Sequence, residues 1–438
     1  MHAVSRDQPS QTHTGQRRGN SQSQTRKRFG IALMLFVLTD AAAASSKTVQ
    51  WVQTWSASPM TIVAFLQKPA RKLKAQTLRE KVRVSVGGAG LQIRVSNEFG
   101  TKPLRIGAAS IALSDSAAGT RTTSLRRLTF GKSQSSVIPP GAPALSDPID
   151  MAVPDFAELE IRLYLPDEVA LETFHAPNPG DTSLPADTSV STAGDFTLQG
   201  TLPGETPLDS RPFLTGVDVA VVAPTKVVVA LGDSITQGQT HESWPDKFAR
   251  RAAAAKNING RVTIVNAGIG GNRILRDGIG ISAQARFDRD VLAVPGVTHV
   301  IVLEGLNDIG WPGAKLGEIE LADPAEEPSV QDLIAGYMQL IARAHSRQLK
   351  IYGATLPPFE GKTSTWGYYT PAKEQIRQEI NAWIRASGAF DGVIDFEKAL
   401  RDPVAPQRIR AEYSDDSLHP NVAGSKVMAD AVDLNLFK

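Results

Sequence analysis

Apolar and polar residues follow two different patterns along the chain, and the pattern changes near residue 216. Before this point, apolar positions alternate with polar ones, as in Val82–Val86 and Leu91–Val95. This period of two predicts strands with one buried face. After this point, short apolar runs alternate with longer stretches of helical periodicity, which is typical of an α/β fold. We therefore expect an all-β part followed by an α/β part.

The all-β part is expected over residues 47–215, as a β-sandwich-like accessory domain. Gly87–Gly90 separates Val82–Val86 from Leu91–Val95, which predicts a hairpin. Further strand candidates are Leu104–Leu113, Ser124–Phe130 and Leu159–Leu165. Short strands at such spacing predict a sandwich. The stretch 177–212 is rich in Pro, Thr, Gly and Asp, and we interpret it as a loop or linker.

The α/β part is expected over residues 216–438. Its strand candidates are Val227–Leu231, Val262–Val265, His299–Leu303, Ile351–Ala354 and Val393–Phe396. Its helix candidates are Trp244–Ala255, Ser329–Ser346 and Pro371–Ser387. Strands joined by helical crossovers imply a parallel sheet that is covered on both faces. Functional sites on such sheets form beyond the carboxyl ends of the strands.

Polar motifs follow the first three strand candidates, where such a site should form. Ser234 lies in Leu231–Thr236, where the first strand candidate leads into a helical stretch. At such a junction, free N–H groups and the helix dipole favour developing negative charge, which suits an acyl-transfer nucleophile. Asn266–Asn272 follows the second strand candidate, and Glu304–Asp308 follows the third. A further polar motif, Asp415–Pro420, lies near the C-terminus.

These motifs hold the parts of a nucleophilic site. His419 could deprotonate Ser234, while Asp416, three residues before it, fixes the imidazole tautomer and stabilises its protonated form. Asp415 is the rival carboxylate. Gly271 offers an unhindered N–H and Asn307 a side-chain amide, and with the Ser234 N–H they make three donors for a tetrahedral oxyanion. The candidate catalytic residues are Ser234, Gly271, Asn307, Asp416 and His419.

At these residues the chain resembles the SGNH (GDSL-type) hydrolases, which are named for Ser, Gly, Asn and His in separate blocks. The wider pattern resembles the two-domain bacterial branch that includes xylanase-associated acetyl esterases, for example in Trp51–Trp55 and Asp395–Phe396. The resemblance implies a flavodoxin-like, three-layer domain with strand order 2-1-3-4-5 and a metal-free serine esterase mechanism. It also favours Asp416 over Asp415 by its spacing to the histidine. The α/β-hydrolase elbow matches less well, because it needs glycine where Thr236 stands.

Composition excludes several other functions. The 438-residue chain has no cysteine, so disulfides and thiolate chemistry are excluded. We find no metal-ligand spacing and no phosphate loop, and we expect no metal or cofactor. The formal charge is +2, without a basic stripe interleaved with aromatics, so no nucleic-acid partner is expected. Trp311, Phe359, Trp366, Tyr368 and Tyr369 follow the third and fourth strand candidates, and they could line a substrate pocket or simply pack.

Residues 1–46 are expected to be a disordered polar leader followed by a signal peptide. Arg26–Arg28 precedes the apolar run Phe29–Leu38, and small residues follow at Ala41–Ser45. This order is that of a secretory signal. The run is ten residues long, whereas about 20 are needed to span a bilayer. We expect a periplasmic or secreted protein, without a stable membrane anchor after cleavage.

The favoured interpretation is an exported serine esterase that removes short, acetyl-type acyl groups from a carbohydrate through an acyl-enzyme. Its expected partner is a small-molecule or polysaccharide ester. One alternative is a lipid or aryl esterase of the lysophospholipase kind. The other is a non-catalytic carbohydrate-binding protein, and the complete set of five candidate catalytic residues argues against it.

Overall fold

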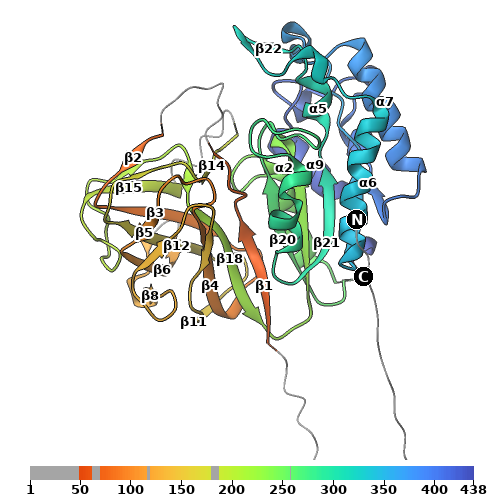
Figure 1. The fold of residues 1–438 in the computed structure, drawn as a ribbon. Helices are drawn as coiled ribbons and strands as arrows, with labels where there is room; N and C mark the ends of the chain where they lie inside the picture. The colour runs from red at the N-terminus through yellow and green to blue at the C-terminus, as the bar shows by residue number, and fades with distance from the viewer. Residues whose placement is uncertain (1–48, 62–69, 116–118, 179–186, 257) are drawn as a thin grey trace, which may run out of the picture. The chain divides into compact units, whose positions relative to one another are not determined.

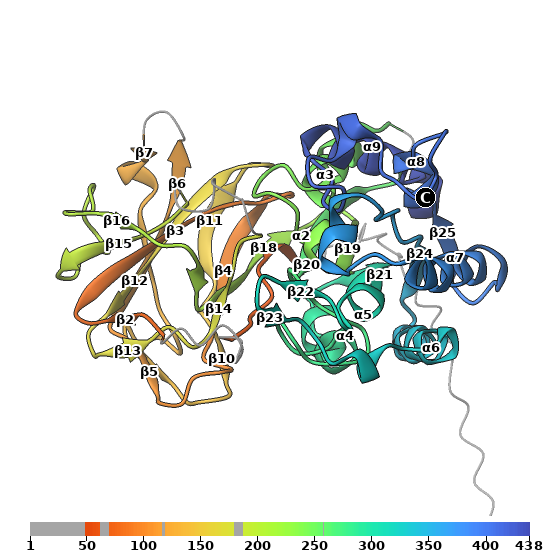
Figure 2. The ribbon, with the colours of Figure 1, turned by 90° about the horizontal axis from the view of Figure 1, so that it is seen from above.

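The computed structural model describes residues 49–61, 70–115, 119–178, 187–256 and 258–438. The predicted leader and signal peptide lie outside these ranges. Strands dominate the chain as far as Val221, and strands alternating with helices follow it (Figures 1 and 2). None of the helices in the described ranges has the length and apolar character needed to cross a bilayer.

The β-rich part holds two antiparallel sheets that share one hydrophobic cluster. The first sheet has the order β1-β18-β4-β10, with β11 paired to β4. Its strands are β1 (Gln50–Ser56), β4 (Gly88–Ser96), β10 (Pro143–Leu145), β11 (Ile149–Val153) and β18 (Leu214–Val221). The second has the order β16-β15-β3-β12-β6-β7, with β8 paired to β6. Its strands are β3 (Gln76–Arg83), β6 (Ala108–Asp115), β7 (Gly119–Thr120), β8 (Arg126–Leu128), β12 (Glu158–Leu165), β15 (Thr188–Ala193) and β16 (Thr206–Pro207).

Short two-stranded pairs complete this part. They are β2 (Lys72–Leu73) with β13 (Val169–Ala170), β5 (Leu104–Ile106) with β9 (Ser136–Ile138), and β14 (Phe174–His175) with β17 (Arg211–Pro212). A β-rich N-terminal part is confirmed. Its shared cluster alternates along the long strands, as at Leu91, Ile93 and Val95, which is the pattern that predicted it.

The predicted hairpin across Gly87–Gly90 is wrong. β3 pairs with β12 and β15, whereas β4 pairs with β18, so the two strands lie in different sheets. A Cβ atom on Gly87 would collide with the backbone of Val153 and Pro154, so close packing, and not a tight turn, requires glycine here. Alternation marks a strand but does not select its partner.

Three other predictions about the β-rich part need correction. Leu104–Leu113 forms two strands, β5 and β6, on either side of Gly107. The expected linker 177–212 contains β15, whose Thr188, Ser189 and Ser191 are buried, so this strand shows no apolar alternation. The expected boundary at 215/216 falls inside β18, which pairs with β1 and β4.

The α/β part is built on a parallel sheet of order β20-β19-β21-β24-β25. Its strands are β19 (Thr225–Gly232), β20 (Arg261–Gly268), β21 (Val297–Leu303), β24 (Lys350–Ala354) and β25 (Gly392–Ile394). Each strand candidate falls on one of these. The last candidate ran too far, because Asp395 caps the next helix.

Helices cover both faces of this sheet, so an α/β fold is confirmed. Helices α3, α8 and α9 pack together on one face, and α4, α6 and α7 pack on the other (Figure 2). The helices are α2 (Ser234–Gln237), α3 (Trp244–Ala254), α4 (Ala283–Phe287), α5 (Leu306–Gly310), α6 (Val330–Ser346), α7 (Pro371–Ala386), α8 (Phe396–Leu400) and α9 (Val422–Ala431). Capping boxes at Ser243 and Ser329 fix where α3 and α6 begin.

The register of the central strands brings the polar motifs together. Gly232, at the end of β19, pairs with Gly268 of β20 and with Leu303 of β21. A side chain at Gly232 would collide with Thr236 and with the Leu303 carbonyl oxygen. The motifs that follow the three strands therefore start from one edge of the sheet.

Candidate active site

Ser234 lies at the start of α2, directly after β19. Asp233 caps this turn by accepting a hydrogen bond from the Ile235 N–H at 2.9 Å. Asn178, from the β-rich part, donates from Nδ2 to the carbonyl oxygens of Ser234 and Gly238, both at 2.8 Å. Both Asp233 and Asn178 therefore hold this turn. Ser234 is nearly buried.

The Ser234 hydroxyl contacts an imidazole that is itself held by a carboxylate. Ser234 Oγ lies 2.9 Å from His419 Nε2, and His419 Nδ1 lies 2.6 Å from Asp416 Oδ2. The side chains of His419 and Asp416 are 35% and 50% exposed. The structure therefore brings together three of the predicted residues, and their contact chain reaches the surface.

The loop before His419 fixes the geometry of the carboxylate. Asp416 Oδ1 accepts the N–H groups of Leu418 and His419 at 2.9 and 2.7 Å, and Ser417 takes a φ of 70° to close this turn. Partial burial opposes ionisation, but the hydrogen bond from the His419 ring and these backbone N–H groups outweigh it. They hold the pKa of Asp416 well below its ordinary value, so this carboxylate is ionised at neutral pH.

The rival carboxylate, Asp415, faces away from this chain of contacts. Its carbonyl oxygen accepts from Lys362 Nζ at 2.8 Å, and its Oδ1 lies 3.5 Å from Asn421 Nδ2. The hydrogen bonds of the His419 ring are to Asp416 and Ser234.

Asn307 lies on α5, at the end of β21. Its Nδ2 donates to the Asn272 carbonyl oxygen at 2.9 Å and has a longer contact, 3.4 Å, with Asp233 Oδ2. The Tyr368 hydroxyl donates to Asn307 Oδ1 at 2.8 Å, which fixes the orientation of the amide. One of the two Nδ2 hydrogens is therefore only weakly engaged, on the side of the Ser234 turn.

Gly271 lies in the loop after β20 with a φ of 75°. A Cβ here would come within 2.7 Å of both Ile279 and Trp311, so conformation and space both require glycine. The neighbouring Gly270 N–H donates to Gln237 Oε1 at 2.6 Å, and Gln237 Nε2 donates to the Ala176 carbonyl oxygen at 2.6 Å. The loop is thereby tied to α2, the helix that begins with Ser234.

Buried carboxyl groups lie beneath these loops. Asp308 accepts the N–H groups of Ile274 and Leu275 at 2.7 and 2.9 Å. Burial raises the pKa of Asp233 and of Asp308 to about 6 in each case. Burial, and the nearby Asp233, raise the pKa of Glu304 well above its ordinary value.

The aromatic residues after β21 and β24 mostly pack. Phe359 and Tyr368 are buried in edge-to-face contact, with their ring centres 5.8 Å apart. The ring centres of Trp366 and Tyr368 are 4.8 Å apart. Trp311 is buried, with the Arg273 guanidinium 5.6 Å from its ring centre. For these four, the packing interpretation holds.

Sequence reasoning missed several residues that support the site. Asn178, Gln237 and Arg286 are single polar residues whose contacts are distant in the sequence, and no local motif marks them. The sequence marks Tyr368 only as an aromatic residue and does not predict its hydrogen bond to Asn307. Within the described ranges, no group of three or more His, Asp or Glu side chains could hold a metal ion.

A serine hydroxyl that contacts a carboxylate-bound imidazole, beside amide donors at a sheet edge, is the arrangement of serine hydrolases. Residues 230–427 match the model of the GDSL-like Lipase/Acylhydrolase family. The matched residues lie in the α/β part and include Ser234, Gly271, Asn307, Asp416 and His419, and members of that family are serine esterases and acylhydrolases.

Solved structures of related description were also found. A GDSL-like lipase from Bacteroides thetaiotaomicron is 18% identical, with 47% of this chain and 84% of that chain covered and a TM-score of 0.35. A member of the lipolytic G-D-S-L family from Veillonella parvula is 19% identical, with 48% of this chain and 96% of that chain covered and a TM-score of 0.34. A catalytic mutant of an acetylxylan esterase from Geobacillus stearothermophilus is 19% identical, with coverages of 47% and 91% and a TM-score of 0.35. A search of curated proteins found no match.

The adjacent carboxylates give a matched pair of variants. Asp416→Asn should lower kcat for ester hydrolysis by about 10³–10⁴, because a neutral amide neither stabilises the imidazolium nor holds the required tautomer. Asp415→Asn should change kcat by less than about threefold, because Asp415 does not contact the ring. Steady-state kinetics on an acetyl ester test this. Equal losses in the two variants would contradict the assignment of Asp416.

Proposed function

We propose that this protein is a serine esterase in which Ser234 is the nucleophile, His419 the general base and Asp416 the residue that orients His419. The proposal depends on one observation, the chain of contacts from Ser234 Oγ through both nitrogens of His419 to Asp416. A hydroxyl needs an adjacent base to act as a nucleophile at neutral pH.

In the first step, Ser234 Oγ attacks the ester carbonyl carbon while His419 Nε2 takes the hydroxyl proton. The carbonyl oxygen becomes an oxyanion, and the N–H groups of Gly271 and Ser234 and the weakly engaged Nδ2 hydrogen of Asn307 stabilise it. As the C–O bond breaks, His419 returns the proton to the departing alcohol. Water then attacks the acyl-enzyme by the same route and releases the acid and the free serine.

Replacing the nucleophile tests the mechanism. Ser234→Ala should lower kcat by about 10⁴ or more, because no acyl-enzyme can form. Its thermal unfolding should resemble that of the natural protein, since the backbone contacts of α2 remain. Labelling with a fluorophosphonate, followed by mass spectrometry, should mark Ser234 in the natural protein alone. A folded variant that retained activity would rule out this mechanism, and a natural protein without esterase activity would favour the carbohydrate-binding alternative.

We further propose that the substrate is a short, acetyl-type ester on a carbohydrate. Two observations support this. The loop around Gly271 packs so closely against Ile279 and Trp311 that it has no space even for a Cβ atom, and a short acyl group needs the least space beside this loop. The exposed side chains of His419 and Asp416 leave the alcohol side open to a large, polar group.

One observation favours a lipid ester instead. Leu316 and Ile319 are 61% and 38% exposed on a hairpin, β22 (Lys315–Leu316) with β23 (Ile319–Glu320), in the segment that follows α5. Exposed apolar side chains near a site can contact acyl chains.

A series of acyl lengths separates these substrates. We expect kcat/KM to be highest for the acetyl ester of 4-nitrophenol and to fall through butyryl, hexanoyl and octanoyl, because each added methylene lacks apolar surface. Acetylated xylan should release acetate, with Ser234→Ala as the blank. A site that buried the longer chains would instead gain about 0.8 kcal/mol per methylene, close to fourfold. A maximum at hexanoyl or octanoyl would support the lipid alternative.

We also propose export to the periplasm or the medium, on the pattern of residues 26–45. Expression in a bacterial host, cell fractionation and sequencing of the mature N-terminus test this. We expect a mature N-terminus close to residues 41–47. An uncleaved protein confined to the cytoplasm would contradict it.

A further inference from the structure

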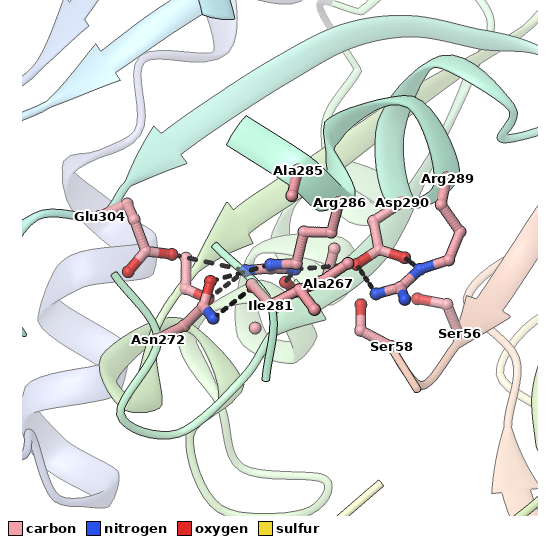
Figure 3. A network of polar contacts seen from close by, with 12 residues as sticks. Ser56, Ser58, Ala267, Asn272, Ile281, Ala285, Arg286, Arg289, Asp290 and Glu304 are labelled. Atoms are coloured by element: carbon pink, nitrogen blue, oxygen red, sulfur yellow. Dashed lines mark hydrogen bonds and ion pairs between the residues drawn. The ribbon is translucent and has the colours of Figure 1, made fainter. Parts of the chain in front are cut away.

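Arg286, on α4, is a fully buried arginine, 0% exposed. Figure 3 shows the network of polar contacts around it. A guanidinium has five N–H groups in a rigid plane, and here each one has an acceptor. Nε donates to Asn272 Oδ1 at 2.9 Å. Nη1 donates to the Ala267 carbonyl oxygen at 2.6 Å and to Asp290 Oδ2 at 3.0 Å. Nη2 donates to the Gly232 carbonyl oxygen at 3.0 Å and to Glu304 Oε2 at 3.4 Å.

Four of these acceptors, all except Asp290, lie at or just beyond the ends of three neighbouring strands. Gly232 ends β19 and precedes Asp233 and Ser234. Ala267 is the next-to-last residue of β20, and Asn272 directly follows Gly271. Glu304 directly follows β21 and precedes the helix that carries Asn307. One side chain therefore contacts the three chain segments that lead to Ser234, Gly271 and Asn307, and Figure 3 shows these contacts converging on it.

On the basis of the proposed function, we propose that Arg286 is a positioning residue for catalysis. It sets the distances between the nucleophile and the two loops that supply the oxyanion donors. The Asn272 link extends this to Asn307, because the Asn272 carbonyl oxygen accepts from Asn307 Nδ2 at 2.9 Å. Oxyanion donors act only when they are held at the correct distance, and a displacement of about 1 Å can cost about 10²-fold in rate.

Charge pairing alone does not account for these contacts. The short bonds to the strand ends go to neutral carbonyl oxygens, while the Glu304 contact is the longest. Asp290 has a second cation, because Arg289 Nε and Nη2 donate to its two oxygens at 2.6 and 2.8 Å. Without Arg286, Asp290 would therefore still be paired.

Arg289 provides a matched control, visible beside Arg286 in Figure 3. It shares Asp290 and also pairs with Glu98 at 2.7 Å, but its hydrogen bonds go to none of the three loops. Arg286→Lys keeps the charge, yet an ammonium has three donors and cannot reach five acceptors in one plane. We expect Arg286→Lys to lower kcat by about 10² or more with KM changed less than about threefold. Arg289→Lys should leave kcat within about threefold.

A double-mutant cycle separates positioning from a general loss of stability. Asn307→Ala alone should lower kcat by about 10²–10³. If Arg286 acts by placing the oxyanion donors, adding Arg286→Lys to Asn307→Ala should cost at least tenfold less than it costs in the natural protein. A purely structural role would give losses that multiply. Multiplying losses, or equal kcat losses in Arg286→Lys and Arg289→Lys, would overturn the proposal.

A second variant covers the case in which Arg286→Lys does not fold. Asn272→Ala leaves Arg286 in place but unties it from the loop of Gly271, and it should lower kcat about tenfold with KM little changed. An unchanged kcat in this variant would also overturn the proposal. Ser234→Ala, measured in parallel, keeps the two proposals distinct. If Ser234→Ala retains activity, the proposed function fails. If Ser234→Ala is inactive while Arg286→Lys keeps its kcat, only the positioning role fails.

Discussion

The parallel pairing of β19 with β20 and β21 is the constraint on which the site depends. Because Gly232 is in register with both Gly268 and Leu303, three loops leave the sheet at one edge. The Gly232 and Ala267 carbonyl oxygens and the Glu304 carboxylate converge on the Arg286 guanidinium, and a buried cation is a direct way to satisfy them there. The sheet register therefore places the loops of the site, and the individual side chains then complete it.

In the proposed mechanism, the exposed and buried halves of this site have different tasks. The contact from His419 to Asp416 lies near water and uses a short loop whose backbone N–H groups already hold the carboxylate. The donors on the other side depend on buried groups, such as Tyr368 on Asn307 and Gln237 on Gly270. Proton transfer tolerates solvent, whereas stabilisation of an oxyanion gains from a rigid, drier surrounding.

Much of this could be predicted from the sequence, and the missing parts have a common cause. The strands of the parallel sheet are continuous apolar runs, and Ser234, Gly271, Asn307 and His419 stand in local motifs that follow three of them or lie near the C-terminus. Sheet partners in the β-rich part could not be predicted, because alternation at Val82–Val86 fits any antiparallel neighbour. β15 was missed because its buried residues, apart from Val190, are Thr188, Ser189 and Ser191, which do not form an apolar face. Arg286 left no signal, since its acceptors are scattered along the sequence and two of them are backbone carbonyl oxygens.

The contact of Asn178 with α2 has a consequence for modularity. This residue belongs to the segment between β14 and β15, yet it caps the turn that begins with Ser234, and the adjacent Ala176 carbonyl oxygen holds Gln237. The β-rich part therefore supplies structural pieces of the hydrolase site and is not only an attached module. An exchange of accessory domains between related enzymes would have to transfer residues 176–178 with their partners on α2, or the recipient would lose the hydrogen bonds to Asn178 and Ala176 that hold the turn beginning with Ser234.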